Sequence, residues 1–423
     1  MEKIRVYGEQ KVNGKVHISG AKNAALPLLA SAILSEEGLT LKNVPPLSDI
    51  STMIALLETL GIECVVSSAG DYSETVTCKT DSIDNFTAPY AIVKKMRASI
   101  LVLGPLLARF GHCSVSLPGG CAIGVRPIDL HLKGLMAMGA EVDLKDGYVQ
   151  AKAQKGLKGT EFEFPISTVT GTENLLMAAV IADGETVLKN AAREPEIVDL
   201  ANCLKKMGAK IEGEGTSEIR VVGVPRLHHA EHSVLVDRIE AGTYAVAAAI
   251  TKGQVDLIGG NFRKLLPTFI EKMEECSLIF EDIPNGIRAK SAGEIRPIDF
   301  QTEPFPGFPT DLQAQTMALL CLASGKSVID EKIWENRFMH VAELARMGAD
   351  ISVSGSQATV CGVDHLVGAP VMATDLRASF SLVLAGLAAK GETLVDRVYH
   401  LNRGYCCAEK KLADCGVRVD RIK

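Results

Sequence analysis

The chain repeats one structural unit six times, and this repetition limits its fold more than any other feature. Each copy starts at a small or polar turn and continues into an apolar helical stretch and a short β-branched strand. A second helix follows and ends in a large residue, a glycine and a small apolar residue. The spacing of roughly 70 residues is too long for a solenoid unit and suits a βαβαββ unit. The copies begin at Gly20, near Arg97, and at Gly171, Ala241, Pro309 and Arg377.

The closing step of each copy has a backbone reason. Leu60-Gly61-Ile62 and Met138-Gly139-Ala140 are typical, and only the fourth copy, with Cys276-Ser277-Leu278, lacks the glycine. A glycine directly after a helix is favoured because the chain there adopts a left-handed conformation. The pattern therefore predicts a helix end at each step.

The first helix of each copy is almost free of charge, as Leu175–Ala182 and Tyr244–Ile250 show. A helix that is apolar on all sides is buried. We therefore expect an α/β protein of two similar domains, each of three βαβαββ units with inner helices surrounded by sheets. A polar stretch at 226–232 separates the copies into residues 22–232 and residues 1–21 plus 233–423. The strand at Lys3–Tyr7 could pair with either half, and generic α/β alternation is the weaker alternative.

Composition narrows the class of protein. Hydrophobic residues make up 47% and charged residues 23% of the chain, as in an ordinary globular protein, and 423 residues favour two domains. The net charge of -6 argues against a nucleic-acid or polybasic membrane surface. The start MEKIRVYGEQ is not typical of a secretory signal, and no apolar stretch is long enough to span a bilayer. We expect a cytoplasmic protein with reduced thiols.

Polar residues recur where helices begin. Helix N-termini favour anions, and arginine binds oxyanions through two parallel hydrogen bonds. Lys22, Arg126 and Arg403 are therefore predicted to hold a phosphate or carboxylate in a cleft between the domains; for each residue alone, a solvated surface role is the alternative. The first helices begin at Lys22, Asn23, Arg97, Asp311 and Arg377, and the second at Asp49, Arg126, Arg193, Glu194, Glu196, Glu335, Arg337 and Arg403.

One cysteine lies in a loop of unusual composition. Cys121 stands in LPGGCAIGVRP, among three glycines and next to Arg126 and a helix start at Pro127. A nearby guanidinium and a helix N-terminus lower a thiol pKa, which suits proton transfer or nucleophilic attack. An inert cysteine is the alternative.

Asp311 stands just before an apolar helix in FPTDLQAQ. On its own, this position favours an N-cap residue. The nine histidines form no HExxH pattern, the chain has no Walker loop, and no GxGxxG follows a strand. We therefore expect no metal site and no cofactor.

At these motifs the chain resembles the UDP-N-acetylglucosamine 1-carboxyvinyltransferase family of enolpyruvyl transferases. The resemblance runs through the whole chain and implies an inside-out α/β barrel in each of two domains, with the active site in the cleft between them. The matching stretches include GAKNAALPLL from Gly20, LPGGCAIGVRPIDLHLKGL from Leu117, NAAREPEIVDLA from Asn190, FPTDLQAQ from Phe308 and ENRFMHVAELARMGA from Glu335.

The resemblance implies an addition–elimination between phosphoenolpyruvate and UDP-N-acetylglucosamine, the first committed step of peptidoglycan synthesis. Cys121 would protonate C3 of phosphoenolpyruvate, and Asp311 would accept the proton of the sugar 3′-hydroxyl. Lys22, Arg126 and Arg403 would bind phosphate, and Arg377 the carboxylate. The catalytic set implied is thus Cys121, Asp311, Lys22 and Arg403.

The same resemblance implies the residues that line the substrate site. Some members carry Lys in the stretch 164–170, where this chain has none, so the diphosphate contact there stays open. Asn402 stands where Asp is frequent, and Cys406 and Cys407 have no functional account. The substrate-lining residues implied are Lys22, Asn23, Asp49, Arg97, Arg126, Pro127, Ile128, Asp129, Leu130, His131, Ser167, Thr168, Val169, Thr170, Asp311, Ile333, Glu335, Asp375, Arg377 and Arg403.

Two rivals remain at this stage. One is the sister enolpyruvyl transferase of shikimate 3-phosphate, against which GAKN and the cysteine loop argue. The other is a non-catalytic paralogue that binds UDP-sugar, although Cys121 and Asp311 are both present. The expected partners are the two small-molecule substrates, with neither nucleic acid nor membrane, in a monomer or weak homo-oligomer.

Overall fold

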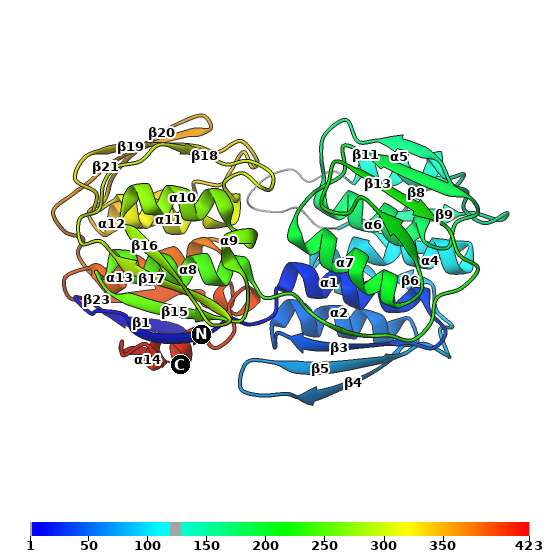
Figure 1. Ribbon diagram of the computed structural model, residues 1–423, viewed down its shortest axis with the longest axis horizontal. Coiled ribbons are helices and arrows are strands. Elements are labelled where there is room, and N and C mark those ends of the chain that lie inside the picture. The colour runs from blue at the N-terminus through cyan, green and yellow to red at the C-terminus, as the bar shows by residue number, and fades with distance from the viewer. Residues whose placement is uncertain (1, 119–127, 423) are drawn as a thin grey trace. The chain divides into compact units, whose positions relative to one another are not determined.

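The computed structural model describes residues 2–118 and 128–422, which form two compact units (Figure 1). Unit 1 comprises residues 2–19 and 236–422, and unit 2 comprises residues 20–118 and 128–235. The units divide after Ser19 and Leu235, where the sequence led us to expect boundaries after residues 21 and 232.

Unit 2 is built from twelve strands and nine helical segments. Its strands are β3 (Leu39–Val44), β4 (Glu63–Ser68), β5 (Glu74–Lys79), β6 (Thr87–Ala88), β7 (His112–Ser116), β8 (Glu141–Lys145), β9 (Tyr148–Lys152), β10 (Glu161–Glu163), β11 (Glu185–Lys189), β12 (Lys210–Glu212), β13 (Glu218–Val222) and β14 (Glu231–Ser233). Its helices, with 3₁₀ segments marked η, are α1 (Lys22–Ser31), η1 (Ala32–Leu34), α2 (Ser48–Thr59), α3 (Tyr90–Val93), η2 (Arg97–Val102), α4 (Leu103–Phe110), α5 (Asp129–Ala137), α6 (Val169–Ala179) and α7 (Pro195–Lys206). These counts cover the described residues.

Unit 1 has matching contents within its described residues. Its strands are β1 (Lys3–Tyr7), β2 (Asn13–His17), β15 (Gln254–Ile258), β16 (Leu278–Ile283), β17 (Gly286–Ser291), β18 (Phe300–Gln301), β19 (Lys326–Asp330), β20 (Asp350–Ser354), β21 (Gln357–Cys361), β22 (Pro370–Met372), β23 (Glu392–Asp396) and β24 (Val419–Ile422). Its helices are α8 (Arg238–Ile250), α9 (Phe262–Leu265), α10 (Pro267–Cys276), η3 (Thr310–Leu312), α11 (Gln313–Leu320), α12 (Val341–Arg346), α13 (Ala378–Ala388), η4 (Leu401–Arg403) and α14 (Ala408–Asp414).

Six four-stranded sheets, three in each unit, share one strand order. In the sheet β10-β11-β13-β12, the first pair is parallel and the two other pairs are antiparallel. The sheets β6-β7-β9-β8 and β18-β19-β21-β20 repeat this arrangement. It is the topology of a βαβαββ unit, so the predicted fold of two similar α/β domains is confirmed.

Segments distant in the chain complete three of these sheets. Strand β1 lies between β23 and β24, and β2 pairs in parallel with β15, so the N-terminal segment belongs to unit 1. Strand β14 pairs in parallel with β3 and supplies the first copy with its missing strand. The pairing of Lys3–Tyr7, which the sequence left open, is thereby decided.

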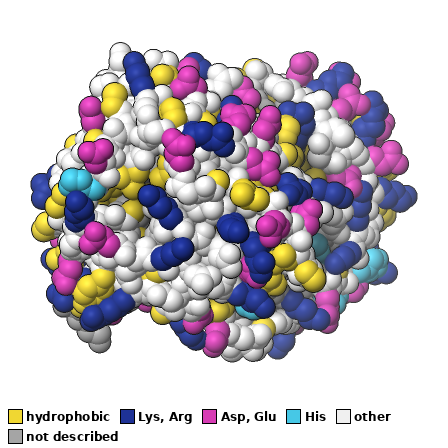
Figure 2. Space-filling model, turned by 60° about the vertical axis from the view of Figure 1, so that its left-hand side comes forward, with side chains coloured by type: hydrophobic (Ala, Val, Ile, Leu, Met, Phe, Trp, Pro, Cys, Tyr) yellow, Lys and Arg dark blue, Asp and Glu magenta, His cyan; other side chains and the backbone are white. Residues whose placement is uncertain are grey.

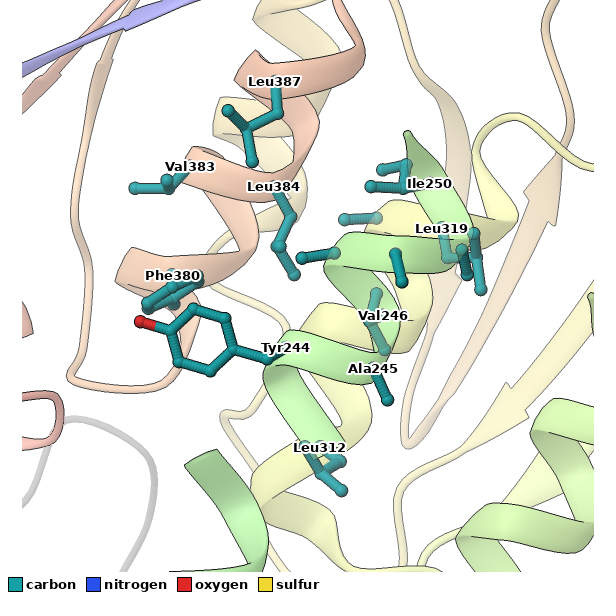
Figure 3. Close-up of a cluster of buried hydrophobic side chains, with 14 of the residues drawn as sticks. Tyr244, Ala245, Val246, Ile250, Leu312, Leu319, Phe380, Val383, Leu384 and Leu387 are labelled. Atoms are coloured by element: carbon teal, nitrogen blue, oxygen red, sulfur yellow. The ribbon is translucent and has the colours of Figure 1, made fainter. Parts of the chain in front are cut away.

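The first helices of the copies form the inner layer of each unit. In unit 1, α8, α11 and α13 pack against one another and bury nearly every residue. Figure 3 shows part of this cluster of buried side chains, with the Tyr244 ring of α8 lying against Phe380 of α13. In unit 2, α1, α4 and α6 take the same role. Complete burial explains why these helices carry so few charges.

The closing glycines adopt the expected backbone conformation. Gly61, Gly139 and Gly208 in unit 2, and Gly348 and Gly416 in unit 1, all have positive φ values between 80° and 106°. Residues with a β-carbon rarely adopt this conformation, which is why glycine recurs at the step.

The distribution of charged side chains on the surface fits a chain with a small net negative charge. On the face shown in Figure 2, acidic and basic side chains are mixed, without a continuous field of one sign. No helix among the described residues is long and apolar enough to cross a bilayer.

Candidate active site

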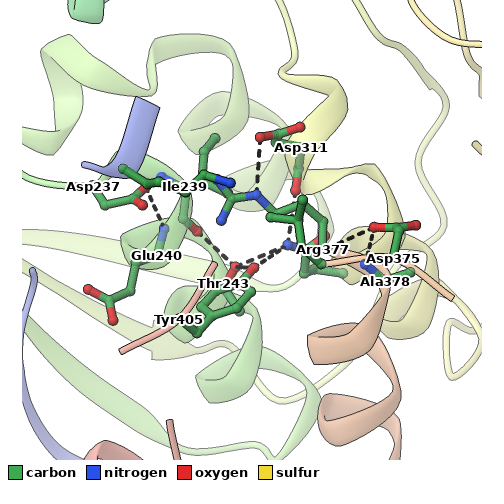
Figure 4. A network of polar contacts seen from close by, with 12 residues as sticks. Asp237, Ile239, Glu240, Thr243, Asp311, Asp375, Arg377, Ala378 and Tyr405 are labelled. Carbon is green, nitrogen blue, oxygen red and sulfur yellow. Dashed lines mark hydrogen bonds and ion pairs between the residues drawn. The ribbon is translucent and has the colours of Figure 1, made fainter. Parts of the chain in front are cut away.

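In unit 1, Asp311 lies between two buried arginines. It is the central residue of η3, just before α11. Its Oδ1 accepts a hydrogen bond from Arg337 Nη2 at 2.9 Å. Its Oδ2 accepts one from Arg377 Nε at 3.1 Å (Figure 4). The arginine side chains are 4% and 2% exposed, whereas that of Asp311 is 25% exposed. Asp311 is therefore an oriented, ionised carboxylate that a ligand can still reach, and it does not cap the helix.

Arg377 has hydrogen-bonding capacity left over. Burial opposes its charge, but Asp311 and Tyr405 outweigh burial and raise the pKa of Arg377 above its ordinary value. Its Nη1 is buried and has no hydrogen-bond partner within the described residues. The backbone N–H groups of Arg377 and Ala378 donate to Asp375 Oδ1 at 2.8 and 3.0 Å, which fixes the start of α13. A charged guanidinium with an unused donor is suited to an oxyanion.

A buried amide connects Asp311 to the inner helices. Gln315 Nε2 donates to the backbone carbonyl of Asp311 at 2.9 Å and to Tyr405 Oη at 2.9 Å, and lies 3.1 Å from Thr243 Oγ1. The Arg377 guanidinium lies 5.4 Å from the centre of the Tyr405 ring. Sequence reasoning missed Gln315 and Tyr405, although a glutamine inside an apolar helix was a usable signal.

The segment with Ile333 is held by a carboxylate that has no ion pair within the described residues. Glu331 Oε1 accepts hydrogen bonds from Ile333 N at 2.9 Å and Trp334 N at 3.1 Å, and Oε2 accepts one from Thr310 Oγ1 at 2.9 Å. One side chain thus fixes both Ile333 and the residue before Asp311.

Three predicted positions in unit 1 differ from expectation. The sequence placed Glu335, Arg337 and Arg403 at helix starts. Glu335 and Arg337 instead lie in the turn between β19 and α12, with Glu335 exposed and Arg337 buried, because α12 begins only at Val341. Arg403 ends η4, since the turn before α14 contains its own 3₁₀ segment. A helix N-terminus therefore does not support anion binding at these residues.

In unit 2, the two helix starts of the first copy meet. Lys22 Nζ, on the first residue of α1, lies 3.1 Å from Asp49 Oδ2, in the first turn of α2. Both side chains are 7% exposed. Asn23, the next residue of α1, is exposed. The first residue of α1 and the first turn of α2 are thus joined by a buried ion pair within one repeat.

His131 joins α5 to the start of α6. Its Nε2 lies 3.2 Å from Thr170 Oγ1 and its Nδ1 lies 3.0 Å from Asn174 Nδ2. Burial, with a smaller contribution from Arg97, lowers the pKa of His131 to about 4. The imidazole is therefore neutral at pH 7. Asn174 was not predicted as a site residue.

The other predicted residues of unit 2 lie close by in the chain but differ in environment. Arg97 begins η2, and Thr168 caps α6 by accepting from Gly171 N at 3.4 Å. Asp129 is turned toward Lys133, with 3.1 Å between its Oδ2 and the Lys133 Nζ. The side chains of Arg97, Thr168 and Asp129 are half-buried, as are those of Ile128, Leu130, Ser167 and Val169. Cys121, Arg126 and Pro127 lie outside the described residues.

Three carboxyl side chains, Glu173, Glu194 and Glu196, lie near one another in unit 2. Burial, and then the neighbouring Glu196 and Glu194, raise the pKa of Glu173 well above its ordinary value. Glu194 and Glu196 begin α7, as the sequence suggested. Within residues 2–118 and 128–422, no group of three or more His, Cys, Asp or Glu is arranged to hold a metal ion.

Comparison with known proteins agrees with this architecture. Residues 6–412 match the family described as EPSP synthase (3-phosphoshikimate 1-carboxyvinyltransferase). The solved structure of the enolpyruvyl transferase NikO from Streptomyces tendae covers 99% of this chain and 98% of its own, with a TM-score of 0.89 and 23% identity. EPSP synthase from Acinetobacter baumannii covers 100% of both chains, with a TM-score of 0.75 and 18% identity. At these identities the two structures establish the fold.

Curated relatives are much closer in sequence. The protein named UDP-N-acetylglucosamine 1-carboxyvinyltransferase in Dinoroseobacter shibae is 60% identical over the full length of both chains. The protein of that name in Paramagnetospirillum magneticum is 56% identical over 100% of this chain and 99% of its own. Full-length identity at this level confirms the resemblance drawn from the motifs, and the chain belongs to the UDP-N-acetylglucosamine 1-carboxyvinyltransferase family of enolpyruvyl transferases.

Proposed function

We propose that this protein transfers the enolpyruvyl group of phosphoenolpyruvate to the 3′-hydroxyl of UDP-N-acetylglucosamine and releases phosphate. The observation that carries the proposal is the 60% identity, over both full lengths, with a protein named for that transfer. The ionised Asp311 beside two buried arginines supports it, because the reaction needs a base next to groups that bind anions.

The proposed chemistry is an addition followed by an elimination. Asp311 accepts the hydroxyl proton while the sugar oxygen bonds to C2 of phosphoenolpyruvate and Cys121 gives a proton to C3. The tetrahedral ketal then loses a C3 proton and breaks its bond to phosphate, which leaves the enol ether. Arg377 binds the carboxylate through its unused Nη1. Lys22, Arg126 and Arg403 bind the phosphate, on which charge builds as it leaves.

The binding site of the acceptor, UDP-N-acetylglucosamine, is assigned to residues of the family motifs. Asn23, Arg97, His131, Thr170 and Ile333 are proposed to line the UDP-sugar, together with the remaining substrate-lining residues predicted above. The product feeds peptidoglycan synthesis, and thereby cell shape and division. We place the reaction in the cytoplasm, where phosphoenolpyruvate and nucleotide sugars are made. We expect the protein to be a monomer or a weak homo-oligomer.

The deciding experiment is phosphate release with phosphoenolpyruvate and each of two acceptors. UDP-N-acetylglucosamine should support release, and shikimate 3-phosphate should not. Release with shikimate 3-phosphate alone would favour the sister activity. The absence of release with either acceptor, at any enzyme concentration, would leave a protein that binds UDP-sugar without catalysis.

The role of Cys121 has its own test. Fosfomycin, an epoxide analogue of phosphoenolpyruvate, should alkylate Cys121 and add its mass to that peptide. Cys121→Asp should retain some turnover and escape alkylation, because a carboxylic acid can also deliver a proton. An unmodified Cys121 peptide in fully inhibited protein would refute this role.

A further inference from the structure

Asn174, on the inner helix α6, hydrogen-bonds to the backbone of a second helical segment, at the junction of η2 and α4. Its side chain is fully buried, Oδ1 accepts a hydrogen bond from Gly104 N at 2.6 Å, and Nδ2 donates to Ile100 O at 3.0 Å. These are the two backbone groups that an ordinary i→i−4 helical bond would pair, at the junction of η2 and α4. A β-carbon on Gly104 would collide with Asn174, so glycine is required for this approach.

The two backbone bonds decide how the amide is oriented. A backbone N–H can only donate and a carbonyl can only accept, so Oδ1 must face Gly104 and Nδ2 must face Ile100. Nδ2 carries a second hydrogen, and it points at His131 Nδ1, 3.0 Å away. That ring nitrogen must therefore accept.

The tautomer of His131 follows. With Nδ1 as an acceptor, the single ring proton lies on Nε2, which donates to Thr170 Oγ1 at 3.2 Å. Burial and Arg97 keep the pKa of His131 near 4, while Asp129 opposes them, so the ring stays neutral at pH 7. Helix α5 packs against α6, and Gly134 lies close to the side chain of Leu175 in that contact.

Thr170 is the last residue in this series of hydrogen bonds from Asn174 through His131. Its hydroxyl oxygen accepts from His131, so its own hydrogen is directed elsewhere, and no other bond of this hydroxyl is seen within the described residues. Thr170 is half-buried at the second position of α6. The side chain thus offers one hydrogen-bond donor to a ligand that lies against the start of the helix.

We propose that Asn174 is a positioning residue that fixes His131 in its Nε2–H form, so that Thr170 presents a donor to an acceptor oxygen of the UDP-sugar. The inference rests on the proposed function, because His131 and Thr170 are assigned to the acceptor site there. A merely structural Asn174 would stabilise α4 and α6 without affecting substrate affinity through Thr170.

The tautomer is measured directly in the free protein by nitrogen-15 NMR of the His131 ring. The wild type should show an Nε2–H ring at pH 7 without titration above pH 5. In Asn174→Asp the new carboxylate cannot donate to Nδ1, so the proton should move to Nδ1 and Nε2 should accept from Thr170. An Nδ1–H ring in the wild type would overturn the inference.

Kinetics then separate positioning from structure. Thr170→Val should raise the KM for UDP-N-acetylglucosamine about 3–10-fold, with kcat within about twofold, as expected for one lost neutral hydrogen bond to substrate. Thr170→Ser should restore the wild-type KM. Asn174→Asp should raise KM by a similar factor, and the double variant should be no worse than Thr170→Val alone, since both remove the same donor.

Asn85→Asp is the matched control. Asn85 also bonds to two backbone groups, donating to Thr59 O at 2.9 Å and accepting from Thr87 N at 3.0 Å, but lies outside the assigned residues. The Asn85→Asp variant should leave both the KM for UDP-N-acetylglucosamine and kcat unchanged. If Asn174→Asp does not fold, the wild-type tautomer and the Thr170 pair still decide. An unchanged KM in Thr170→Val refutes the inference, whereas a wild type inactive with UDP-N-acetylglucosamine refutes the proposed function and leaves the tautomer result intact.

Discussion

The two units have the same arrangement of sheets and inner helices, but the polar groups at the ends of their inner helices differ in charge. In unit 1 the polar centre is ionic, because Asp311 is held by Arg337 and Arg377, whose side chains are almost inaccessible. In unit 2 the corresponding centre is mostly neutral, because Asn174 and His131 bond through an amide and an uncharged ring. Three apolar inner helices can thus enclose either kind of centre.

The difference follows from how each charge is compensated. A buried ion is costly unless it is paired and hydrogen-bonded, and Asp311 satisfies two arginines at once. In unit 2 the buried Glu173 has carboxyls as neighbours, and burial together with these neighbours raises its pKa well above the ordinary value. Unit 1 therefore has an ionic centre around Asp311, whereas unit 2 has directed neutral hydrogen bonds around His131 in addition to its buried Lys22–Asp49 ion pair.

The largest expected effect distinguishes Asp311 from an ordinary aspartate of unit 1. Asp311→Asn should lower kcat about 10²–10⁴-fold, since the base is lost. Asp330 is the control, because its side chain is also 25% exposed and also pairs with a cation, Lys332, at 2.6 Å. Asp330→Asn should leave kcat unchanged in the same phosphate-release assay. Equal losses in two folded variants would contradict the assignment.

A second comparison uses the buried lysine of each unit. Lys411 Nζ lies 2.7 Å from both Glu240 Oε1 and Ser19 Oγ, with 1% and 2% of the two charged side chains exposed. Lys411→Met should lower the free energy of unfolding by about 3–5 kcal/mol, because a buried carboxyl loses its partner. Turnover by the folded fraction should stay within about twofold of the wild type.

Lys22→Met should show the reverse balance, because Lys22 is assigned to the substrate phosphate. We expect a smaller loss in the free energy of unfolding, with a loss of kcat/KM for phosphoenolpyruvate that exceeds tenfold. Urea unfolding and steady-state kinetics on both variants give the two numbers. A Lys411→Met protein that folds normally but turns over slowly would show that the ionic centre of unit 1 extends to α14.

Acid should destabilise both units through their buried histidines. Burial lowers the pKa of His131 and of His340 to about 4, from an ordinary 6.5. Between these values the unfolded chain binds more protons, so stability is lost as the pH falls through this window. The loss is about 2 kcal/mol for each histidine between pH 6.5 and 5. Urea unfolding of His131→Gln and His340→Met should show that much less dependence on pH.

The two histidines should differ at pH 8. His131 makes hydrogen bonds to Asn174 and Thr170, whereas neither ring nitrogen of His340 has a partner within the described residues. His131→Gln should therefore cost about 1 kcal/mol at pH 8, and His340→Met should cost less. A larger loss for His340→Met would show that its nitrogens have a partner after all.

The sequence predicted the arrangement of helices and strands well, because both the repeats and the buried helices have clear residue patterns. The closing glycines and the uncharged helices Leu175–Ala182 and Tyr244–Ile250 were sufficient for the six units and the inner layer. Strand exchange was harder, because β1, β2 and β14 are short and pair with segments far away in the chain. Register across such distances depends on the assembled core, which no local pattern reports.

The site was predicted in part, for a similar reason. Lys22, Asp49, Asp311 and Arg377 could be found from their places in the repeat and from family motifs. Gln315 and Asn174 act by joining separate helices, and a single sequence does not show which helices touch. A buried amide in an otherwise apolar helix is nevertheless a usable sign of such a junction.

The last comparison concerns the sign of a small effect at two neighbouring amides of α11. Gln313 and Gln315 are both fully buried, but the amide of Gln313 has no hydrogen-bond partner within the described residues, whereas Gln315 bonds to Asp311 O and Tyr405 Oη. Gln313→Met should raise the free energy of unfolding by about 1–2 kcal/mol, because it removes an unpaired buried polar group at similar volume. Gln315→Met should lower it by about as much and reduce kcat, since the carbonyl of Asp311 loses its anchor. Because helix propensity and side-chain size change equally in both variants, a shared sign in urea unfolding would mean that hydrogen bonding does not separate these positions, and that the ionic centre of unit 1 is held by its arginines alone.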